Sequence, residues 1–314
     1  SYTIDVYKKK TEATDDIVSF FAYVSFFPQL VAGPIERATR LLPQFYKERT
    51  FSYPAAVDGL RQILWGLFKK VVVADNCAVF VNQIYVDYTT KASFSLVLAA
   101  VCFSVQIYCD FSGYSDMAIG TARLFGFRLM RNFNMPYFSR DIAEFWRRWH
   151  ITLGSFFRDY LYIPLGGSRN GNARTVLSLT VVWFFTGLWH GASWNFILWG
   201  VFYGALLIVE KLGLLKVLEK IPSVFSHLYL LFLTLIGWTI FYTTDLGKLG
   251  GYFAVMFGLS GNAISDPQLS ITLMNNLFWL VVAVLFCMPI TQLVKRWAQA
   301  QRSEGVRAGI SIVN

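Results

Sequence analysis

Two of the three histidines in this 314-residue chain stand in surroundings that suggest chemistry. His150 ends the segment FWRRWH at residues 145–150, and His190 lies in TGLWHG at residues 186–191. Imidazole titrates near neutral pH, so it can take up and release a proton during a reaction. An ionisable side chain in or beside a strongly apolar segment is costly and typically functional. The pair therefore predicts proton-transfer chemistry at membrane depth.

A purely structural role remains an alternative for each histidine. A lone histidine in a membrane helix can serve as a hydrogen-bonding residue between helices, and this alternative stays open for His190. His227 follows Pro222 at the start of an apolar run, where an interfacial histidine needs no special role. We therefore interpret His227 as structural.

The composition indicates a membrane protein that could position these side chains. Hydrophobic residues make up 55% of the chain and charged residues only 15%, against about 25% charge in ordinary soluble domains. A membrane-spanning helix needs about 20 mainly apolar residues. We expect spans near residues 17–32, 55–74, 92–109, 175–199, 196–215, 223–242 and 271–294. The overlap of the fourth and fifth predicts a tight turn or re-entrant bend near Trp199 and Gly200.

The net charge and the cysteines indicate which kinds of partner and site to expect. The formal net charge is +9, and basic loops beside membrane spans account for it without nucleic acid as a partner. Cys77, Cys102, Cys109 and Cys287 show no paired spacing and lie mainly in apolar stretches. We expect them to be small buried apolar residues, with no disulfide framework and no metal site.

The chain begins with SYTIDVY, without Met or a signal peptide ahead of it. We therefore expect residues 1–314 to be a single integral membrane domain that lacks N-terminal spans.

Several segments should shape this domain. Prolines in residues 28–54 predict a loop or re-entrant element, followed by a helix from Tyr53 that ends near Lys69 and Lys70. The segment DFSGYSD at residues 110–116 interrupts an apolar run with two carboxylates. It can be a cap and turn between two membrane helices or a functional site, and both interpretations stay open.

Residues 123–174 form an arginine-rich core segment with nine arginines and no lysine. Such a set favours bidentate recognition of phosphate or carboxylate, or pairing with buried acids. A cytosolic loop obeying the positive-inside rule is the alternative, and the two are compatible. Within this segment we predict one helix over residues 139–162, capped by Asp141 and Glu144, with His150 beside Arg147 on one face.

Small residues flank the second histidine. Gly187 and Gly191 are four residues apart, as are Gly200 and Gly204, and such pairs mark close helix packing in membranes. The same glycines would leave space beside the His190 imidazole, where flanking tryptophans could form the walls of a narrow cavity.

Four segments together resemble the membrane-bound O-acyltransferase family. They are PQLVAGPI at 28–35, DFSGYSD at 110–116, FWRRWH at 145–150 and GLWHG at 187–191. The pattern is most similar to the bacterial alginate O-acetyltransferase branch, with the D-alanyl transfer proteins of teichoic acid synthesis as cousins. The resemblance implies an all-helical, multi-pass transmembrane bundle with a central funnel or tunnel. It also implies that His190 is catalytic and that His150 is a second important position.

The resemblance implies an enzyme of the bacterial inner membrane that moves an acyl group, expected to be acetyl, to hydroxyls of an extracytoplasmic polysaccharide. Its partners would be the lipid bilayer, the polysaccharide and extracytoplasmic acetylation proteins. We expect no tightly bound cofactor, and a donor that is acetyl-CoA or a carrier-protein phosphopantetheine thioester. D-alanyl transfer and a non-catalytic acyl conduit or scaffold remain alternatives. An ion transporter is disfavoured because no chain of intramembrane carboxylates is present.

Acyl transfer to an alcohol needs a base for the hydroxyl proton, and we assign this role to His190. His150 would orient a substrate or share the proton transfer. Further candidates for binding the substrate or the acyl donor follow from residue type: the arginines would hold phosphates and the tryptophans would exclude water. These candidates are Arg147, Arg148, Trp149, Trp189, Asn195 and Asp116.

Overall fold

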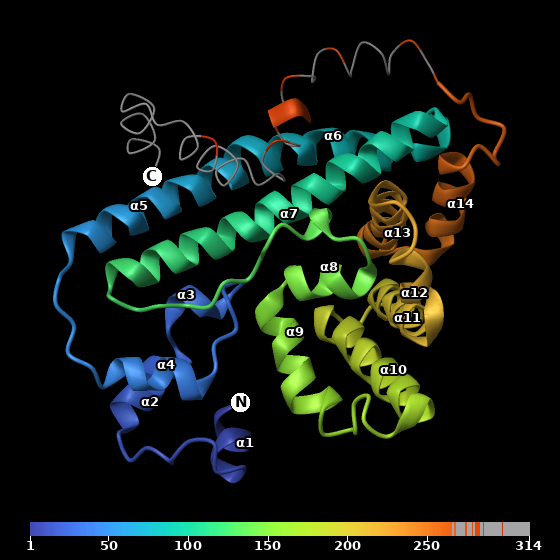
Figure 1. The fold of residues 1–314 in the computed structure, drawn as a ribbon. Helices are drawn as coiled ribbons and strands as arrows, with labels where there is room; N and C mark the ends of the chain where they lie inside the picture. The colour runs from blue at the N-terminus through green and yellow to red at the C-terminus, as the bar shows by residue number, and fades with distance from the viewer. Residues whose placement is uncertain are drawn as a thin grey trace.

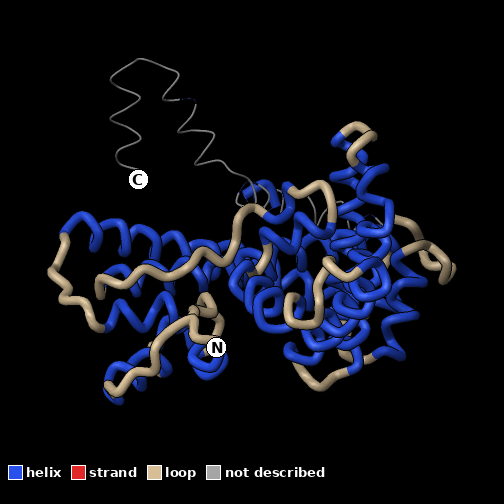
Figure 2. Tube along the Cα trace, turned by 60° about the horizontal axis from the view of Figure 1, so that its bottom comes forward, coloured by secondary structure: helices blue, strands red, loops and turns tan. Residues whose placement is uncertain are grey.

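The computed structural model describes residues 1–265 together with residues 267, 274, 278, 280–282, 285 and 297. The expected span 271–294 therefore lies largely outside the described residues. Helices joined by loops make up the whole described part, which contains no strand, as Figure 2 shows. The prediction of an all-helical fold is confirmed.

Fourteen α-helices occur among the described residues. They are α1 (Tyr2–Tyr7), α2 (Ile17–Val24), α3 (Phe27–Leu30), α4 (Ala38–Phe45), α5 (Tyr53–Leu67), α6 (Asp75–Val86), α7 (Ser93–Leu124), α8 (Ile142–Arg148), α9 (Ile151–Phe157), α10 (Gly171–His190), α11 (Trp194–Val209), α12 (Leu215–Leu218), α13 (Ser223–Tyr242) and α14 (Leu246–Met256). The helices α1 to α4 gather near the N-terminus, and α8 to α13 form a second group (Figure 1).

Helices α5 and α6 follow one another end to end, and both lie alongside the long helix α7 (Figure 1). Glycine on both helices permits the close approach of α5 and α7. A Cβ atom at Gly66 would lie 2.5 Å from the carbonyl oxygen of Gly113, and one at Gly120 would lie 2.5 Å from that of Gly59. The order of these pairs shows that the two helices are antiparallel.

The structure answers two predictions about these helices. Helix α5 ends at Leu67, close to the predicted end at Lys69 and Lys70, but the chain stays helical through a π-helical segment, Phe68–Ala74, into α6. Of the two interpretations left open for the DFSGYSD segment, the cap and turn is wrong, because the segment lies in the middle of the continuous helix α7. The two lysines explain both results: Lys69 pairs with Asp116, and Lys70 pairs with Asp110 at 2.7 Å. Because these ion pairs neutralise the lysines and the carboxylates between the two helices, both segments can remain helical.

The N-terminal region also departs from the predicted span over 17–32. Helix α2 ends at Val24, and the proline-bearing helices α3 and α4 follow as short separate elements. They are joined to the end of α7 by an aromatic cluster, in which the ring of Phe127 lies 4.6 Å from that of Phe26 and 4.7 Å from that of Phe45. Residues 28–54 are therefore an irregular, partly helical segment, as their prolines predicted.

Helices α10 and α11 form a tight hairpin, but its turn is not where the sequence predicted. The chain reverses at residues 191–193, while Trp199 and Gly200 are buried within α11. A side chain at Gly187 would collide with the backbone of Phe196, and one at Gly200 with that of Trp183. These glycines therefore bring the two helices together, as small residues do in membranes.

Two helices of the described part are long and apolar enough to cross a membrane, namely α7 and α13, each with a mean hydropathy of 1.8. The cysteines behave as predicted: Cys77, Cys102 and Cys109 are free and buried. Cys287 lies outside the described residues.

Candidate functional site

His150 lies at a break between two short helices. The single helix predicted for residues 139–162 was wrong, because α8 ends at Arg148 and α9 begins at Ile151. His150 has left-handed backbone angles, φ 44° and ψ 52°. This conformation is uncommon for a residue other than glycine and costs about 1–3 kcal/mol, so the surroundings must stabilise it.

The chain that returns from the end of α7 provides this stabilisation. Residues 125–135 run back along α7 as an irregular segment (Figure 1) and pass beside the break. The backbone N–H of Asn134 donates to the carbonyl of Arg148, and that of Ile151 donates to the carbonyl of Asn132, each at 2.9 Å. These two bonds hold the backbone on both sides of His150, which a continuous helix would not allow.

Acidic side chains fix the start of α8. Asp141 accepts from the backbone N–H of Glu144 at 2.6 Å, and Glu144 accepts from that of Arg140 at 2.8 Å, so the predicted capping arrangement is confirmed. The buried carboxylate of Glu210, at the end of α11, accepts from the N–H groups of Ile142 and Ala143 at 2.8 and 3.0 Å. These three carboxylates therefore anchor the start of the helix that leads to His150.

The His150 side chain is 5% exposed and sits among apolar rings. Its ring lies 4.7 Å from that of Phe111 on α7 and 5.9 Å from that of Trp189 on α10. Its Nδ1 lies 3.0 Å from Oδ1 of Asn132. Burial lowers the pKa of His150 well below its usual value, and nearby His190 adds to this effect. The imidazole is therefore held neutral.

His190 is the last residue of α10 and is surrounded by aromatic side chains. Its ring lies 4.9 Å from Trp189, 5.0 Å from Trp199 and 5.3 Å from Phe241. This aromatic cage holds the imidazole in one place but leaves it half-buried, because Trp189 is itself exposed.

Both histidines line one cavity of about 1100 Å³. Trp189 lies between them in the wall, and much of the remaining lining is aromatic or aliphatic. Two acidic residues, Asp110 and Glu210, also line it, together with four cations: Lys70, Arg147, Arg158 and Lys211. The structure thus unites two histidines 40 residues apart in sequence in one mainly apolar chamber with cationic groups in its wall.

The other predicted site residues divide into two groups. Arg147, Trp149 and Trp189 line the cavity with the histidines. Arg148 instead pairs with Glu144 at 2.5 Å, which fixes α8 rather than the chamber. Asp116 pairs with Lys69 and accepts from Gln62 at 3.0 Å, within the α5–α7 packing.

Asn195 lies apart from the cavity lining and is fully buried. Its Nδ2 donates to the carbonyl of Phe241 at 2.8 Å and so ties α11 to α13 beside the His190 cage. His227, interpreted as structural, has Nδ1 within 2.8 Å of the Ser139 carbonyl.

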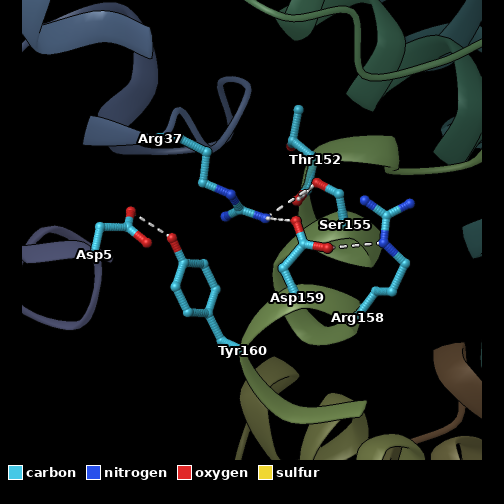
Figure 3. Close-up of polar contacts among 7 residues, drawn as sticks. All are labelled: Asp5, Arg37, Thr152, Ser155, Arg158, Asp159 and Tyr160. Atoms are coloured by element: carbon cyan, nitrogen blue, oxygen red, sulfur yellow. Dashed lines mark hydrogen bonds and ion pairs between the residues drawn. The ribbon is translucent and has the colours of Figure 1, made fainter. Parts of the chain in front are cut away.

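The PQLVAGPI motif forms part of the cavity wall and is fastened to α9 and the π-helical turn after it (Figure 3). The N–H of Ile35 donates to Oγ1 of Thr152 at 3.0 Å. Arg37 donates to Oγ of Ser155 at 3.2 Å and pairs with Asp159 at 3.6 Å. Its guanidinium also lies 4.9 Å from the ring of Tyr160, which donates to Asp5 at 2.6 Å. This network holds the wall in place.

Sequence reasoning missed two residues of the site, Asn132 and Glu210. Glu210 had a signal, since it is a lone acid at the end of the apolar run NFILWGVFYGALLIV. Asn132 had none, because its role depends on the return of residues 125–135 past His150. No cluster of three or more histidine, cysteine or acidic side chains suited to a metal occurs in the described part of the chain.

Comparison with known proteins places this site in a family. The profile of the MBOAT, membrane-bound O-acyltransferase family matches residues 10–243. The chain is 41% identical over 268 residues to the probable alginate O-acetylase AlgI of Azotobacter vinelandii, covering 85% of this chain and 53% of that protein. The chain thus spans about half the length of the curated relatives it matches.

The names of two further relatives refer to other polymers, peptidoglycan and teichoic acid. The peptidoglycan O-acetyltransferase of Helicobacter pylori is 38% identical over 249 residues, which cover 78% of this chain and 47% of that protein. The teichoic acid D-alanyltransferase of Streptococcus thermophilus is 27% identical over 213 residues, or 63% of this chain and 51% of that protein. With its family profile matched across both histidines and the cavity between them, the chain belongs to the membrane-bound O-acyltransferase family.

Proposed function

We propose that this chain carries the acyl-transfer centre of an inner-membrane O-acetyltransferase that acts on an extracytoplasmic polysaccharide. The observation that carries the proposal is the single cavity of about 1100 Å³ lined by both His150 and His190. A chamber of this size accommodates an acyl group and an acceptor hydroxyl together. The named activities of the relatives, alginate O-acetylase and peptidoglycan O-acetyltransferase, support acetyl transfer to a glycan.

The proposed reaction begins at the acceptor hydroxyl. His190 takes the hydroxyl proton as the oxygen attacks the carbonyl carbon of the acyl thioester. The new C–O bond forms, the C–S bond breaks, and the thiolate leaves and accepts the proton from the imidazolium. The aromatic walls around His190 limit water, which would otherwise hydrolyse the thioester.

The cations in the cavity wall suit the proposed donor, acetyl-CoA or a phosphopantetheine thioester on a carrier protein. Arg147, Arg158 and Lys211 all line the cavity, and both donors carry phosphate groups. Trp149 and Trp189 would line the path of the thioester arm. Arg148 is engaged by Glu144 and Arg158 by Asp159, so each would have to exchange its partner to hold a phosphate.

The proposal is tested by replacing His190 with alanine in the full-length protein expressed in its membrane. We expect acylated polysaccharide to fall to background while the amount of inserted protein is unchanged. The matched control is His227→Gln, which keeps a hydrogen-bond donor for the Ser139 carbonyl and should leave the product level as in the wild type. Wild-type product levels in His190→Ala would refute the role of His190 as base.

Mass analysis of surface polysaccharide from cells with and without the protein identifies the transferred group. A protein-dependent acetyl mass on a glycan supports the proposal. A D-alanyl mass would replace it with the activity named for the Streptococcus thermophilus relative. Full product formation in a His150→Ala, His190→Ala double variant would instead indicate a conduit that hands the acyl group to another enzyme.

A further inference from the structure

The buried amide of Asn132 makes three contacts through one oxygen atom. Its Oδ1 lies 3.0 Å from Nδ1 of His150, 2.9 Å from Oγ1 of Thr152 and 3.3 Å from the backbone nitrogen of Thr152. The residue is 1% exposed, so water cannot substitute for these partners. This oxygen is the hydrogen-bonding centre behind the His150 ring.

The contact with Thr152 decides which amide atom faces the imidazole. A backbone N–H can only donate, so the atom that it meets must be the amide oxygen and not the nitrogen. The same oxygen has no proton to give, and Nδ1 of His150 must therefore donate to it. In a neutral imidazole one nitrogen carries the proton, so Nε2 is left with a free lone pair.

The position of Asn132 is itself fixed from two other directions. Its Nδ2 donates to Oγ of Ser115 on α7 at 3.2 Å, and its carbonyl accepts from the N–H of Ile151 at 2.9 Å. Ser115 is also buried. The amide thus has little freedom to rotate and present nitrogen to the histidine.

The orientation of the ring follows from what lines the cavity. His150 contributes to the lining, whereas Asn132 and Thr152 do not. Nδ1 is thus on the side of the ring held by the protein, and the opposite edge, with Nε2, is left for the cavity. A hydrogen bond at one imidazole nitrogen sets the protonation of the other in this way in many active sites.

We propose that Asn132 is a positioning residue that holds His150 in the Nδ1-protonated tautomer, so that Nε2 serves as a proton acceptor in the cavity shared with His190. Of the two roles considered for His150, orienting a substrate or sharing the proton transfer, this arrangement favours the second. When Nε2 accepts a proton, the imidazolium keeps its Nδ1–H bond to Asn132. The proton-accepting role of Nε2 rests on the proposed acyl transfer. The Nδ1-protonated tautomer rests only on the hydrogen bonds of Asn132.

The tautomer can be measured without any reaction. We would label the histidines of the full-length protein with ¹⁵N, reconstitute it in lipid, and assign His150 from the signal that is lost in His150→Gln. We expect His150 to show a protonated Nδ1 and an unprotonated Nε2. In Asn132→Leu this preference should be lost. A protonated Nε2 in the wild type, or the same tautomer in Asn132→Leu, would overturn the proposal.

Thr152→Val is the matched control in this measurement. It removes a hydroxyl that donates to the same Asn132 oxygen and accepts from the Ile35 N–H, but it keeps the backbone N–H and the His150 contact. We expect its His150 tautomer to match the wild type. A change in Thr152→Val as large as that in Asn132→Leu would show that general packing, and not the amide, selects the tautomer.

Asn132→Asp supplies a second test should the leucine variant fail to fold. The carboxylate keeps an acceptor for Nδ1 but stabilises the imidazolium, so the acidic limb of the acyl-transfer pH profile should move to higher pH. In the described part of the chain, His190 is the titratable group that acts on His150, while Phe111 and Trp189 face the ring with apolar surfaces. An unchanged acidic limb would contradict a proton-accepting role for His150.

Activity provides the last comparison. We expect Asn132→Leu to lower acyl transfer by at least about tenfold, because loss of the productive tautomer costs up to about 10⁴-fold in serine protease triads. If every variant, including the wild type, lacks acyl transfer while the tautomer results hold, the proposed function fails and the positioning role stands. If acyl transfer is present in the wild type and the tautomer is indifferent to Asn132, only the positioning role fails.

Discussion

His150 combines an uncommon backbone conformation with a buried ring that lines the cavity along one edge. The left-handed angles turn the chain between α8 and α9, so that the ring points back toward α7 and α10 instead of along a helix face. Strained residues of this kind persist where the surrounding structure over-determines them, and they are frequent at active sites. The side chain is thus placed by its backbone as well as by its hydrogen bond.

The pH response of His150 follows from its burial. Because burial lowers its pKa below the usual value of about 6.5, the ring should stay neutral as the pH falls through the range in which an exposed histidine becomes charged. We therefore expect no imidazolium signal from His150 in a ¹⁵N titration from pH 8 to pH 5. Protonation at the usual pH would show that water reaches the ring.

At the scale of the element, helix pairs joined through glycine decide where the site can form. The α5–α7 pair supplies Phe111 behind His150, and the α10–α11 pair supplies the cage around His190. In both pairs glycine lets backbone approach backbone. Replacing a glycine at one of these helix crossings should therefore shift the helices that carry the cavity walls, even though the glycine itself does not line the cavity.

A pair of Gly→Ala variants tests this dependence. In Gly66→Ala the new methyl group would meet the carbonyl oxygen of Gly113 at 2.5 Å, so the helices must move apart. We expect a loss of about 1–3 kcal/mol in stability, the typical cost of overpacking. Gly250→Ala on α14 meets nothing within 4 Å and should be neutral or gain up to about 1 kcal/mol.

Thermal unfolding of the two purified variants in detergent provides the measurement. The two substitutions add the same methyl group to a helix, so intrinsic helix propensity cancels in the comparison. Equal melting temperatures for Gly66→Ala and Gly250→Ala would contradict a tight α5–α7 crossing.

At the scale of the whole molecule, the cavity joins elements that lie far apart in the sequence, between Gln29 and Phe241. The N-terminal PQLVAGPI segment, the middle of α7, the α8–α9 break and the α10–α13 group all contribute to its wall. Arg37 and Ile35 fasten the first of these to the α9 region, as Figure 3 shows for Arg37. The chamber is a property of the assembled fold and of no single segment.

Filling the chamber should stop acyl transfer without unfolding the protein. Leu207 lines the cavity, and Leu207→Trp would occupy part of the free volume. We expect acylated polysaccharide to fall at least tenfold, with a melting temperature close to that of the wild type. Leu212→Trp, five residues on at an exposed position outside the lining, is the control and should retain wild-type product levels. Equal activity in both variants would argue against use of this cavity.

The parts of the site that depend on residues close together in the sequence could be predicted. The capping of α8 by Asp141 and Glu144 and the glycine contacts of α10 with α11 depend on residues a few positions apart, and both are as predicted. The sequence left a turn open for the DFSGYSD segment, and the structure excludes it because Lys69 and Lys70, some 40 residues earlier, neutralise the carboxylates of the segment. Local polarity alone could not distinguish a turn from a paired helix.

The sequence by itself determined that this is a helical chain of membrane character, that His150 and His190 are its chemically distinctive residues, and which family it belongs to. These conclusions follow from composition, hydropathy and short motifs, which are properties of neighbouring residues. The tertiary structure decided that the chain breaks at His150, that Asn132 meets its ring, and that both histidines share one cavity. Such contacts depend on long-range packing, because the energy of a buried hydrogen bond or a helix crossing is set by partners that only folding brings together.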